Sequence, residues 1–264
     1  MRTICFINWK GGVGKTTLAY NTAYALGQKY DKNKVLYIDA DKQSNGSLWF
    51  KANRMGKTFT DILLDQLPAE EVIQKTHFPN IDIIPSNDSL LDANYAVLGD
   101  DEINQVDILA DSLKNVQDEY SLCIIDCPPD INAPVTNCLM VTDDIVGVTL
   151  PNLFCYEGIT QLQKQLDFMN QDLRLNKEIM GIVINQANPK DINNSICVEI
   201  KKKYKNKLLP SIRGGQTSSM YLNRAINTGT SILDFSPNCG FSQDFKQFVF
   251  ALTKKIMKRI QEGK

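Results

Sequence analysis

One stretch near the N-terminus decides the fold: Lys10-Gly11-Gly12-Val13-Gly14-Lys15-Thr16-Thr17. It follows an apolar run at 3–8 that is typical of a buried strand, and a helical pattern begins directly after it. Glycines allow backbone dihedral angles that other residues avoid, so successive N–H groups can point at phosphate oxygens while the helix N-terminus adds its positive dipole end. The order of strand, glycine loop and helix therefore predicts a phosphate-binding loop.

The side chains of this phosphate loop, residues 10–17, each have an expected role. Lys15 would reach the β- and γ-phosphates of a nucleoside triphosphate, Thr16 would ligate Mg²⁺ and Thr17 would contact the α-phosphate. The ordinary pattern G-x-x-x-x-G-K-[ST] has a glycine where this chain has Trp9, so the match is to the variant K-G-G-x-G-K-[ST], whose extra cation is Lys10. A tight turn without a ligand would explain the glycines but not the Lys-Thr-Thr that follows them.

The rest of the chain alternates short apolar runs with helical patterns. The runs predict seven strands, at 3–8, 34–39, 81–86, 121–126, 144–151, 179–186 and 207–212. Helices are expected at 15–29, 89–98, 103–116, 134–140, 156–170, 193–205, 218–227 and 241–261. Because the runs are nearly continuous rather than alternating, both faces of the sheet should be covered. We expect an α/β fold with a doubly wound, mostly parallel seven-stranded sheet and helices on both faces.

Length and composition bound the architecture. A chain of 264 residues with 43% hydrophobic and 22% charged residues can bury a full core. One domain covering residues 1–264 is the expectation, since α/β folds of about 250 residues are commonly single units. No apolar run approaches the roughly 18 residues of a membrane span and no signal-peptide pattern opens the chain, so a cytoplasmic location is expected.

Carboxylates stand at the ends of two predicted strands. Asp39 and Asp41 end the second strand two residues apart, and Asp126 ends the fourth. We expect both strand ends beside the first strand, where Asp126 can hold Mg²⁺ through water while Asp39 and Asp41 line the γ-phosphate region and Asp41 positions the attacking water. For Asp39 and Asp41 the alternative is an N-cap on the following helix.

The net charge of −1 conceals an asymmetry between the two halves of the chain. Residues 1–132 carry 12 Lys/Arg against 19 Asp/Glu, and residues 133–264 carry 17 against 11. From residue 190 onward there are 14 Lys/Arg and 5 Asp/Glu, with lysines clustered at Lys201, Lys202, Lys203, Lys205 and Lys207. A basic surface of this kind either attracts a polyanion or is a solvated helix face without a partner.

The last predicted helix is amphipathic. Its apolar face carries Phe245, Phe248, Val249, Leu252, Ile256 and Ile260, opposite Lys254, Lys255, Lys258 and Arg259. Packing on the sheet is the expected use of this stripe. Basic amphipathic helices also lie on membranes, so membrane association is the alternative.

The cysteines show no metal-site or disulfide pattern. Seven occur, at Cys5, Cys123, Cys127, Cys138, Cys155, Cys197 and Cys239, scattered among apolar residues without a C-x-x-C pair. We expect buried free thiols.

Three segments together carry a family resemblance. The phosphate loop, Asp39-Ala40-Asp41-Lys42-Gln43-Ser44-Asn45 and Asp126-Cys127-Pro128-Pro129 make the chain resemble the ParA family of plasmid and chromosome partition ATPases, over almost its whole length. The resemblance implies Mg-ATP as cofactor, a homodimer that sandwiches two ATP molecules, and Lys10 reaching across to the phosphates of the other subunit. It also implies hydrolysis that is stimulated by a centromere-binding, ParB-like partner. Intrinsic turnover should be slow, because a switch needs a lifetime in its bound state.

Further residues take expected roles from the same resemblance. Asn185 and Pro210 match the adenine-binding positions of the family, although a strand-end turn residue and a chain stop would look the same. Non-specific binding of the ATP-bound dimer to chromosomal DNA is implied, hence a nucleoid-associated location. The candidate contacts are Lys201, Lys202, Lys203, Arg213 and Arg224.

The chain also departs from the family pattern. Where the family reads D-x-D-P-Q-G-N after the second strand, Lys42 and Ser44 replace the proline and the glycine, and the I-P-R-x-x-x-x-x-E-A pattern that often follows the last strand is altered. Similar MinD-like ATPases cycle on membranes, but they generally lack the Gln43/Asn45 and Cys-Pro-Pro features. Carriers of metal clusters share the loop too, and such a role would require Cys123 and Cys127.

Overall fold

Apolar β-branched residues form the central strands of the molecule. The computed structural model describes residues 1–28, 34–100, 104–188 and 194–263. Its strands are β1 (Arg2–Ile7), β2 (Val35–Asp39), β3 (Gln74–Lys75), β4 (Ile81–Ile84), β5 (Leu122–Asp126), β6 (Asp144–Thr149) and β7 (Ile179–Ile184). They form a seven-stranded sheet in the order β3-β4-β2-β5-β1-β6-β7. Strand β3 runs antiparallel to β4, while the pairs β1/β5, β2/β5, β2/β4 and β6/β7 are parallel. The expected α/β fold with a mostly parallel sheet is confirmed.

The strand expected at 207–212 is wrong. Its first residue belongs to a 3-10 helix, η4 (Lys205–Lys207), and the segment beyond it makes only isolated bridges, Ile182 with Leu208 and Ala187 with Arg213. Pro210 interrupts a ladder there, because proline has no N–H to donate. The seventh strand is instead β3, whose two residues are too short to leave a pattern in the sequence.

The expected neighbours of the first strand also need correction. Strand β5, which ends in Asp126, pairs with β1. Strand β2, which ends in Asp39, pairs with β4 and β5, so β5 separates it from β1.

Every expected helix occurs, most with shifted ends. The helices are α1 (Lys15–Gln28), α2 (Asn45–Trp49), α3 (Phe59–Asp65), η1 (Ala69–Glu71), α4 (Leu90–Gly99), α5 (Ile108–Ser112), η2 (Lys114–Val116), α6 (Ala133–Val141), α7 (Leu153–Asp172), α8 (Ser195–Lys203), α9 (Gln216–Thr228), α10 (Ile232–Phe235) and α11 (Gly240–Gln261). The helix expected at 103–116 is divided into α5 and η2. Expected ends at Lys29, Ile103 and Asn193 lie outside the described residues. The short helices α2, α3 and α10 were not predicted, although Thr58 and Asp61 form a capping box at the start of α3.

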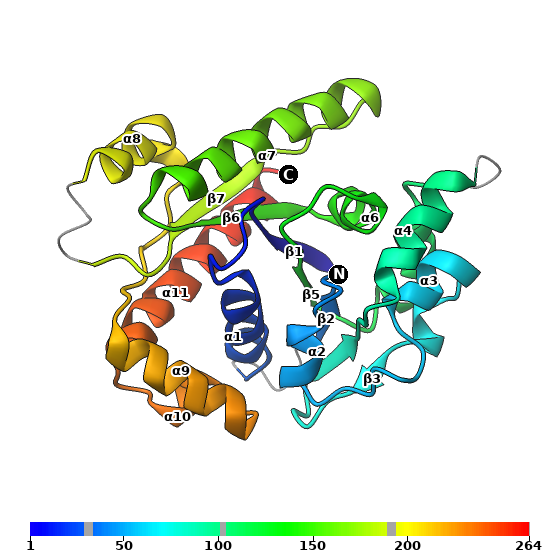
Figure 1. Cartoon of the computed structure of the whole chain (residues 1–264), viewed down its shortest axis with the longest axis horizontal. Helices are drawn as coiled ribbons and strands as arrows, with labels where there is room; N and C mark the ends of the chain where they lie inside the picture. Colours follow the sequence, from blue (N-terminus) through cyan, green and yellow to red (C-terminus); the bar gives the residue numbers. More distant parts are fainter. Residues whose placement is uncertain (29–33, 101–103, 189–193, 264) are drawn as a thin grey trace. The chain divides into compact units, whose positions relative to one another are not determined.

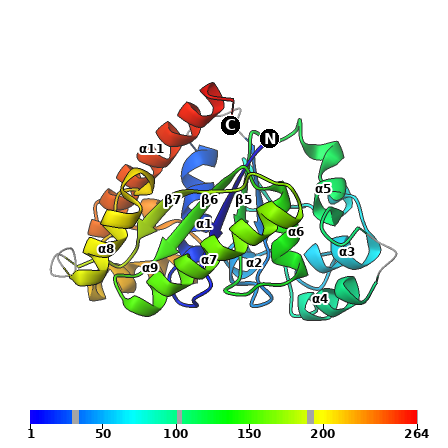
Figure 2. The same ribbon diagram turned by 90° about the horizontal axis from the view of Figure 1, so that it is seen from above.

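The described residues fall into two compact units. The first unit comprises residues 1–6 and 16–142, and the second comprises residues 7–15 and 143–264. In the first unit, β5 lies between α1 and α6, and α3 and α4 lie side by side (Figures 1 and 2). Its core includes the ring of Tyr20, stacked on Trp49 with centroids 3.9 Å apart. In the second unit, β6 and β7 lie between α7 and α11 (Figures 1 and 2).

The C-terminal helix α11 packs within the second unit. Phe245, Phe248 and Leu252 are fully buried, and Val249 and Ile256 are nearly so, which confirms packing as the use of the apolar stripe. Ile260, the last residue of this stripe and near the end of the helix, is 48% exposed. No helix in the described part of the chain is both long enough and apolar enough to span a bilayer.

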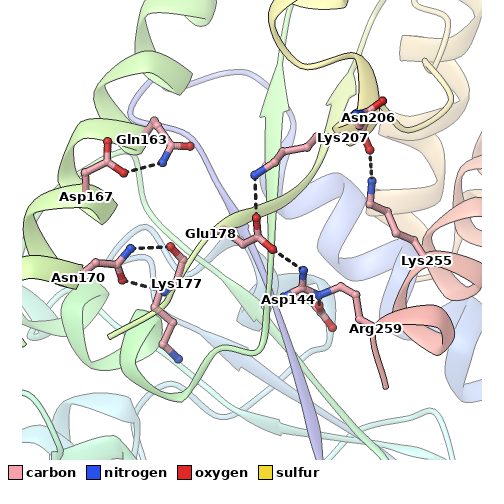
Figure 3. A network of polar contacts seen from close by, with 10 residues as sticks. All are labelled: Asp144, Gln163, Asp167, Asn170, Lys177, Glu178, Asn206, Lys207, Lys255 and Arg259. Carbon is pink, nitrogen blue, oxygen red and sulfur yellow. Dashed lines mark hydrogen bonds and ion pairs between the residues drawn. The ribbon is translucent and has the colours of Figure 1, made fainter. Parts of the chain in front are cut away.

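A network of charged side chains fastens the end of α11 (Figure 3). Arg259 contacts the carboxylate of Asp144, 2.9 Å from Nε to Oδ1, and that of Glu178, 2.7 Å from Nη1 to Oε1. Lys207 bonds the other oxygen of Glu178 at 3.0 Å. The hydrogen bonds from Arg259 and Lys207 lower the pKa of Glu178 to about 2.

Candidate functional site

The phosphate loop has one crowded and one open glycine. Gly12 and Gly14 adopt φ of 74° and 92°, in the region where side chains other than glycine are strained. A Cβ added to Gly14 would lie 2.3 Å from Nδ2 of Asn185, whereas one added to Gly12 would meet nothing within 4 Å. The loop is thus tightly backed on one side and open at Gly12, as a phosphate cradle requires.

Asn8, for which no role was predicted, holds the start of the loop in place. Its Nδ2 donates to the carbonyls of Val148 (2.7 Å) and Cys155 (3.1 Å), and its Oδ1 accepts from the backbone N–H of Lys10 (2.9 Å). Gly158 lets α7 approach, because a Cβ there would lie 2.1 Å from Oδ1 of Asn8. A fully buried amide at the end of an apolar strand must find hydrogen-bond partners. The position of Asn8 directly after an apolar run was therefore the signal in the sequence that it has a structural role.

The two loop lysines differ in exposure. Lys15 is buried, and its Nζ donates to the carbonyls of Asn8 (3.2 Å) and Lys10 (3.1 Å). Its ammonium group is therefore held against the loop backbone. Lys10 is half-buried, and the neighbouring Gly11 and Gly12 are exposed.

The predicted adenine residues lie near the end of β7. Nδ2 of Asn185 donates to the carbonyl of Val13 at 2.8 Å, so this side chain supports the phosphate loop. Its buried Oδ1 has no hydrogen-bond partner among the described residues. Pro210 is half-buried in the segment that runs along β7, where Leu209 donates to the carbonyl of Ile182 (2.8 Å) and Ile212 to that of Ile184 (3.0 Å).

In the first unit, the carboxylates of β2 and β5 stand side by side. Asp39 and Asp126 are register partners, and the N–H of Ala40 donates to the carbonyl of Asp126 at 3.0 Å. Both side chains are buried. Oδ2 of Asp39 accepts from the N–H and the hydroxyl of Ser47, each at 2.7 Å. Since Ser47 lies in the first turn of α2, Asp39 satisfies one donor of that helix N-terminus, although it is not the N-cap that the alternative predicted, because Ser44 holds that position.

Burial has the largest effect on the pKa values of Asp39 and Tyr37. It raises the pKa of Asp39 to about 6, although the bonds from Ser47 oppose the shift. It also raises the pKa of Tyr37 well above its usual range, with the charges of Asp126 and Asp39 adding to the effect. Thr16, at the start of α1, and Asp126 offer the hard oxygen donors that Mg²⁺ takes together with water and substrate phosphates, so the residues fit this metal.

Asp41 begins a tight turn that ends in a strained residue. Its Oδ1 accepts from the N–H of Gln43 at 2.9 Å. Ser44, which stands where the family pattern has glycine, adopts φ 49° and ψ 35° in the left-handed region. Its buried hydroxyl accepts a hydrogen bond from Nη1 of Arg54 at 2.8 Å. Arg54 and Ser47 support the carboxylate segment, and neither was predicted from the sequence.

The candidate DNA-contact residues lie on three segments of the second unit. Lys201, Lys202 and Lys203 are on α8, Arg224 is on α9, and Arg213 precedes α9. The guanidinium group of Arg213 forms two 2.7 Å bonds with the carboxylate of Asp244, which partly neutralises it. The others, apart from half-buried Lys201, are exposed.

The cysteines are thiols. Six of the seven are buried, and Cys239 is partly exposed. The Sγ atoms of Cys5 and Cys127 lie 3.2 Å apart, and burial raises the pKa of the Cys5 and Cys138 thiols. Among the described residues no group of three or more His, Cys, Asp or Glu side chains is arranged to hold a metal ion.

Comparison with known proteins assigns the family. The model of an AAA-domain family matches residues 1–180. The chain is 30% identical to the virulence plasmid ParA family protein pGP5-D of Chlamydia psittaci, over 98% of this chain and 96% of that protein. It is 28% identical to the chromosome partitioning protein ParA of Myxococcus xanthus, over 80% of this chain and 74% of that protein.

Solved structures share the fold. Apo McdA of Cyanothece superposes with a TM-score of 0.84 at 20% identity, covering 97% of this chain and 99% of that one. A plasmid partition protein of Borrelia burgdorferi bound to AMPPNP superposes with a TM-score of 0.77 at 22% identity, covering 96% and 99%. The chain therefore belongs to the ParA family of partition ATPases and has the α/β fold of the ParA, MinD and McdA proteins.

Proposed function

We propose that the chain is a single-domain DNA partition ATPase that binds Mg-ATP. The observation that carries this proposal is a phosphate loop with two lysines, tightly backed at Gly14 and open at Gly12. Lys15 and the N–H groups of Gly11 to Gly14 bind the β- and γ-phosphates, and Thr17 contacts the α-phosphate. Asn185 and Pro210 lie at the adenine.

Metal binding and water positioning fall to the remaining site residues. Thr16 would hold Mg²⁺, with Asp126 contributing through water, and the bound ion would supply positive charge beside the phosphates. Asp41 orients the water that attacks the γ-phosphoryl group, and Asp39 holds the Asp41 segment, since its Oδ1 accepts from the Asp41 N–H at 3.2 Å. Slow intrinsic turnover suits a switch that must persist in its bound state.

The nucleotide controls assembly. Lys15 is buried against the loop, whereas half-buried Lys10 is available for the phosphates of a second subunit. ATP therefore produces a sandwich homodimer. Dimerisation doubles the basic surface, which includes Lys201, Lys202, Lys203 and Arg224. Arg213 contributes less to this surface, because Asp244 partly neutralises its charge.

Doubling the basic surface increases the number of phosphate contacts and makes DNA binding non-specific and salt-dependent. Hydrolysis, stimulated by a centromere-binding, ParB-like partner, releases the DNA. In the cell this places the protein in the cytoplasm, associated with the nucleoid.

Cosedimentation tests the proposal. The wild-type protein with Mg-ATP should pellet with duplex DNA of arbitrary sequence, less so as salt rises, and should not pellet with anionic liposomes. Lys15→Ala should abolish nucleotide binding, and Lys10→Ala should bind ATP but remain monomeric. Asp41→Ala should dimerise on DNA and hydrolyse poorly. Binding to liposomes instead of DNA would favour a membrane-cycling ATPase of the MinD kind, and a monomeric Asp41→Ala protein in ATP would contradict the role of Asp41.

A further inference from the structure

Helix α4 presents an apolar stripe to solvent. Leu91, Tyr95 and Leu98 follow one another at helical spacing and are 42%, 68% and 56% exposed. Residues spaced by four and three positions share one face of a helix. The opposite face of α4 is buried through Leu90, Ala93 and Val97, so the helix is already docked without using this stripe. Single exposed apolar residues are ordinary, whereas several on one face mark an interaction surface.

A second segment extends the stripe. Oδ1 of Asn94 accepts from the N–H of Ala133 at 2.9 Å, which ties the turn at 130–132 to α4 between Leu91 and Leu98. Ile131 in this turn is 51% exposed. Leu91, Tyr95, Leu98 and Ile131 together define the α4 patch, which lies entirely within the first unit. Helix α4 lies next to α6, which begins at Ala133 (Figures 1 and 2).

The patch lies in the most acidic part of the chain. Residues 87–132 contain 11 Asp/Glu and a single basic residue, Lys114, whose ammonium group is 2.7 Å from Asp111. Asp88, Asp92 and Asp130 are exposed beside the stripe or within its turn. A ligand for this surface needs apolar side chains on one side and cations around them.

We infer that the α4 patch is the docking surface for a basic amphipathic segment of the protein partner that stimulates hydrolysis. This rests on the proposed function for the partner's role, but the surface itself follows from exposure and charge. Ile131 lies five residues after Asp126, so a partner seated here contacts the segment that begins at the proposed metal ligand. A second copy fits less well, because a twofold contact would place this acidic surface against itself.

A designed peptide probes the surface. It is an amphipathic helix of about 18 residues with leucine on one face and lysine elsewhere. One control peptide scrambles the leucine positions at the same composition, and another replaces lysine by glutamate. Binding to the full-length protein is measured by fluorescence anisotropy without nucleotide, and hydrolysis is measured with Mg-ATP at saturating peptide.

Variants at exposed positions locate the binding. Leu91→Glu and Tyr95→Glu should keep the melting temperature within about 2 °C, because neither side chain is buried. Each should weaken peptide binding at least tenfold, and Asp92→Lys should weaken it through charge alone. Phe250→Glu, which alters a 69% exposed residue of α11, is the matched control and should bind as the wild type does.

The outcomes separate the possibilities. Stimulation of hydrolysis by the peptide in the wild type but not in Leu91→Glu supports the inference. Equal binding by wild type, Leu91→Glu and Tyr95→Glu overturns it, as does binding at the patch without any change in hydrolysis. Loss of ATP-dependent self-association in Leu91→Glu would assign the patch to a second copy instead. If the wild type hydrolyses no ATP yet binds the peptide through the patch, the proposed function fails while the surface stands.

Discussion

Arg259, near the end of α11, forms an ion pair with Asp144, the first residue of β6, with 2.9 Å between Nε and Oδ1. The aspartate side chain is completely buried and the arginine is 16% exposed. Arg259 also contacts Glu178, so one guanidinium group connects α11 to two positions outside it (Figure 3). Removing one partner of a buried pair is far more costly than removing a surface pair.

Arg259→Met should therefore destabilise the protein by roughly 3–5 kcal/mol, because it takes a cation away from a buried carboxylate. Lys258→Met, one residue earlier, is the control: Lys258 is 74% exposed and 3.6 Å from Glu262, and its loss should cost about 0.5 kcal/mol or less. Urea denaturation of the nucleotide-free protein measures both. A cost below about 1 kcal/mol for Arg259→Met would show that the pair does not hold α11.

Gly14→Ala should weaken Mg-ATP binding at least tenfold. The new Cβ would lie 2.3 Å from Nδ2 of Asn185, and the alanine would have to adopt the φ of 92° that Gly14 has. Gly99→Ala is the matched control, since Gly99 ends α4 with ordinary φ and no atom within 4 Å of the added Cβ. Isothermal titration calorimetry with a non-hydrolysable ATP analogue compares the two. Equal affinities would contradict a loop whose shape depends on Gly14.

Arg54→Ala should reduce kcat several-fold with little change in KM for ATP. Arg54 supports Ser44 in a left-handed conformation that costs a non-glycine residue roughly 1 kcal/mol. Ser44 lies between Asp41 and Ser47 in the chain, and Ser47 is the hydrogen-bond partner of Asp39. Glycine adopts this conformation without strain, so Ser44→Gly should restore kcat in the Arg54→Ala background. Steady-state hydrolysis of the four proteins in this cycle is the measurement. A double variant no faster than Arg54→Ala would mean that Arg54 acts by another route.

The stability of the nucleotide-free protein should depend on the protonation of Asp39. Its pKa of about 6 in the fold lies above the ordinary 3.8, so the folded protein binds a proton between these values that the unfolded chain has released. The protonation of Asp39 therefore contributes at most about 3 kcal/mol to the free energy of unfolding. This contribution is fully present below about pH 4 and is lost as the pH rises through 6. Asp39→Asn lacks this titration.

Relative to the wild type, Asp39→Asn should therefore gain stability between pH 4.5 and pH 7.5. Denaturation of both proteins at the two pH values gives the difference in the free energy of unfolding, in which the titration of other groups cancels. A constant difference for Asp39→Asn would contradict the raised pKa of Asp39.

The sequence predicts the parallel core because buried strands leave continuous apolar runs, as at 35–39 and 122–126. It fails at 207–212, where an apolar run lies beside β7 but Pro210 withholds a donor, and at Gln74–Lys75, where pairing with β4 needs no apolar residue. Strand order is likewise set by tertiary packing. Nothing local to Asp39 indicates that β5 separates its strand from β1.

Within the site, the sequence reveals residues whose chemistry is tied to a short motif, such as Lys10, Lys15 and Asp126. Supporting residues are harder to predict. Arg54 lies ten positions from Ser44 and no pattern joins them. The amide of Asn8 meets carbonyls about 140 and 147 positions further on, which only the fold brings together.

Trp9 gives the phosphate loop an intrinsic optical reporter. The chain has two indoles, and the other, Trp49, is stacked on Tyr20 in the first unit. Replacing Trp49 by phenylalanine leaves Trp9 as the sole tryptophan emitter, one residue before Lys10. Nucleotide arrival can then be followed in real time by stopped-flow emission, without attaching a dye to either the protein or the ATP.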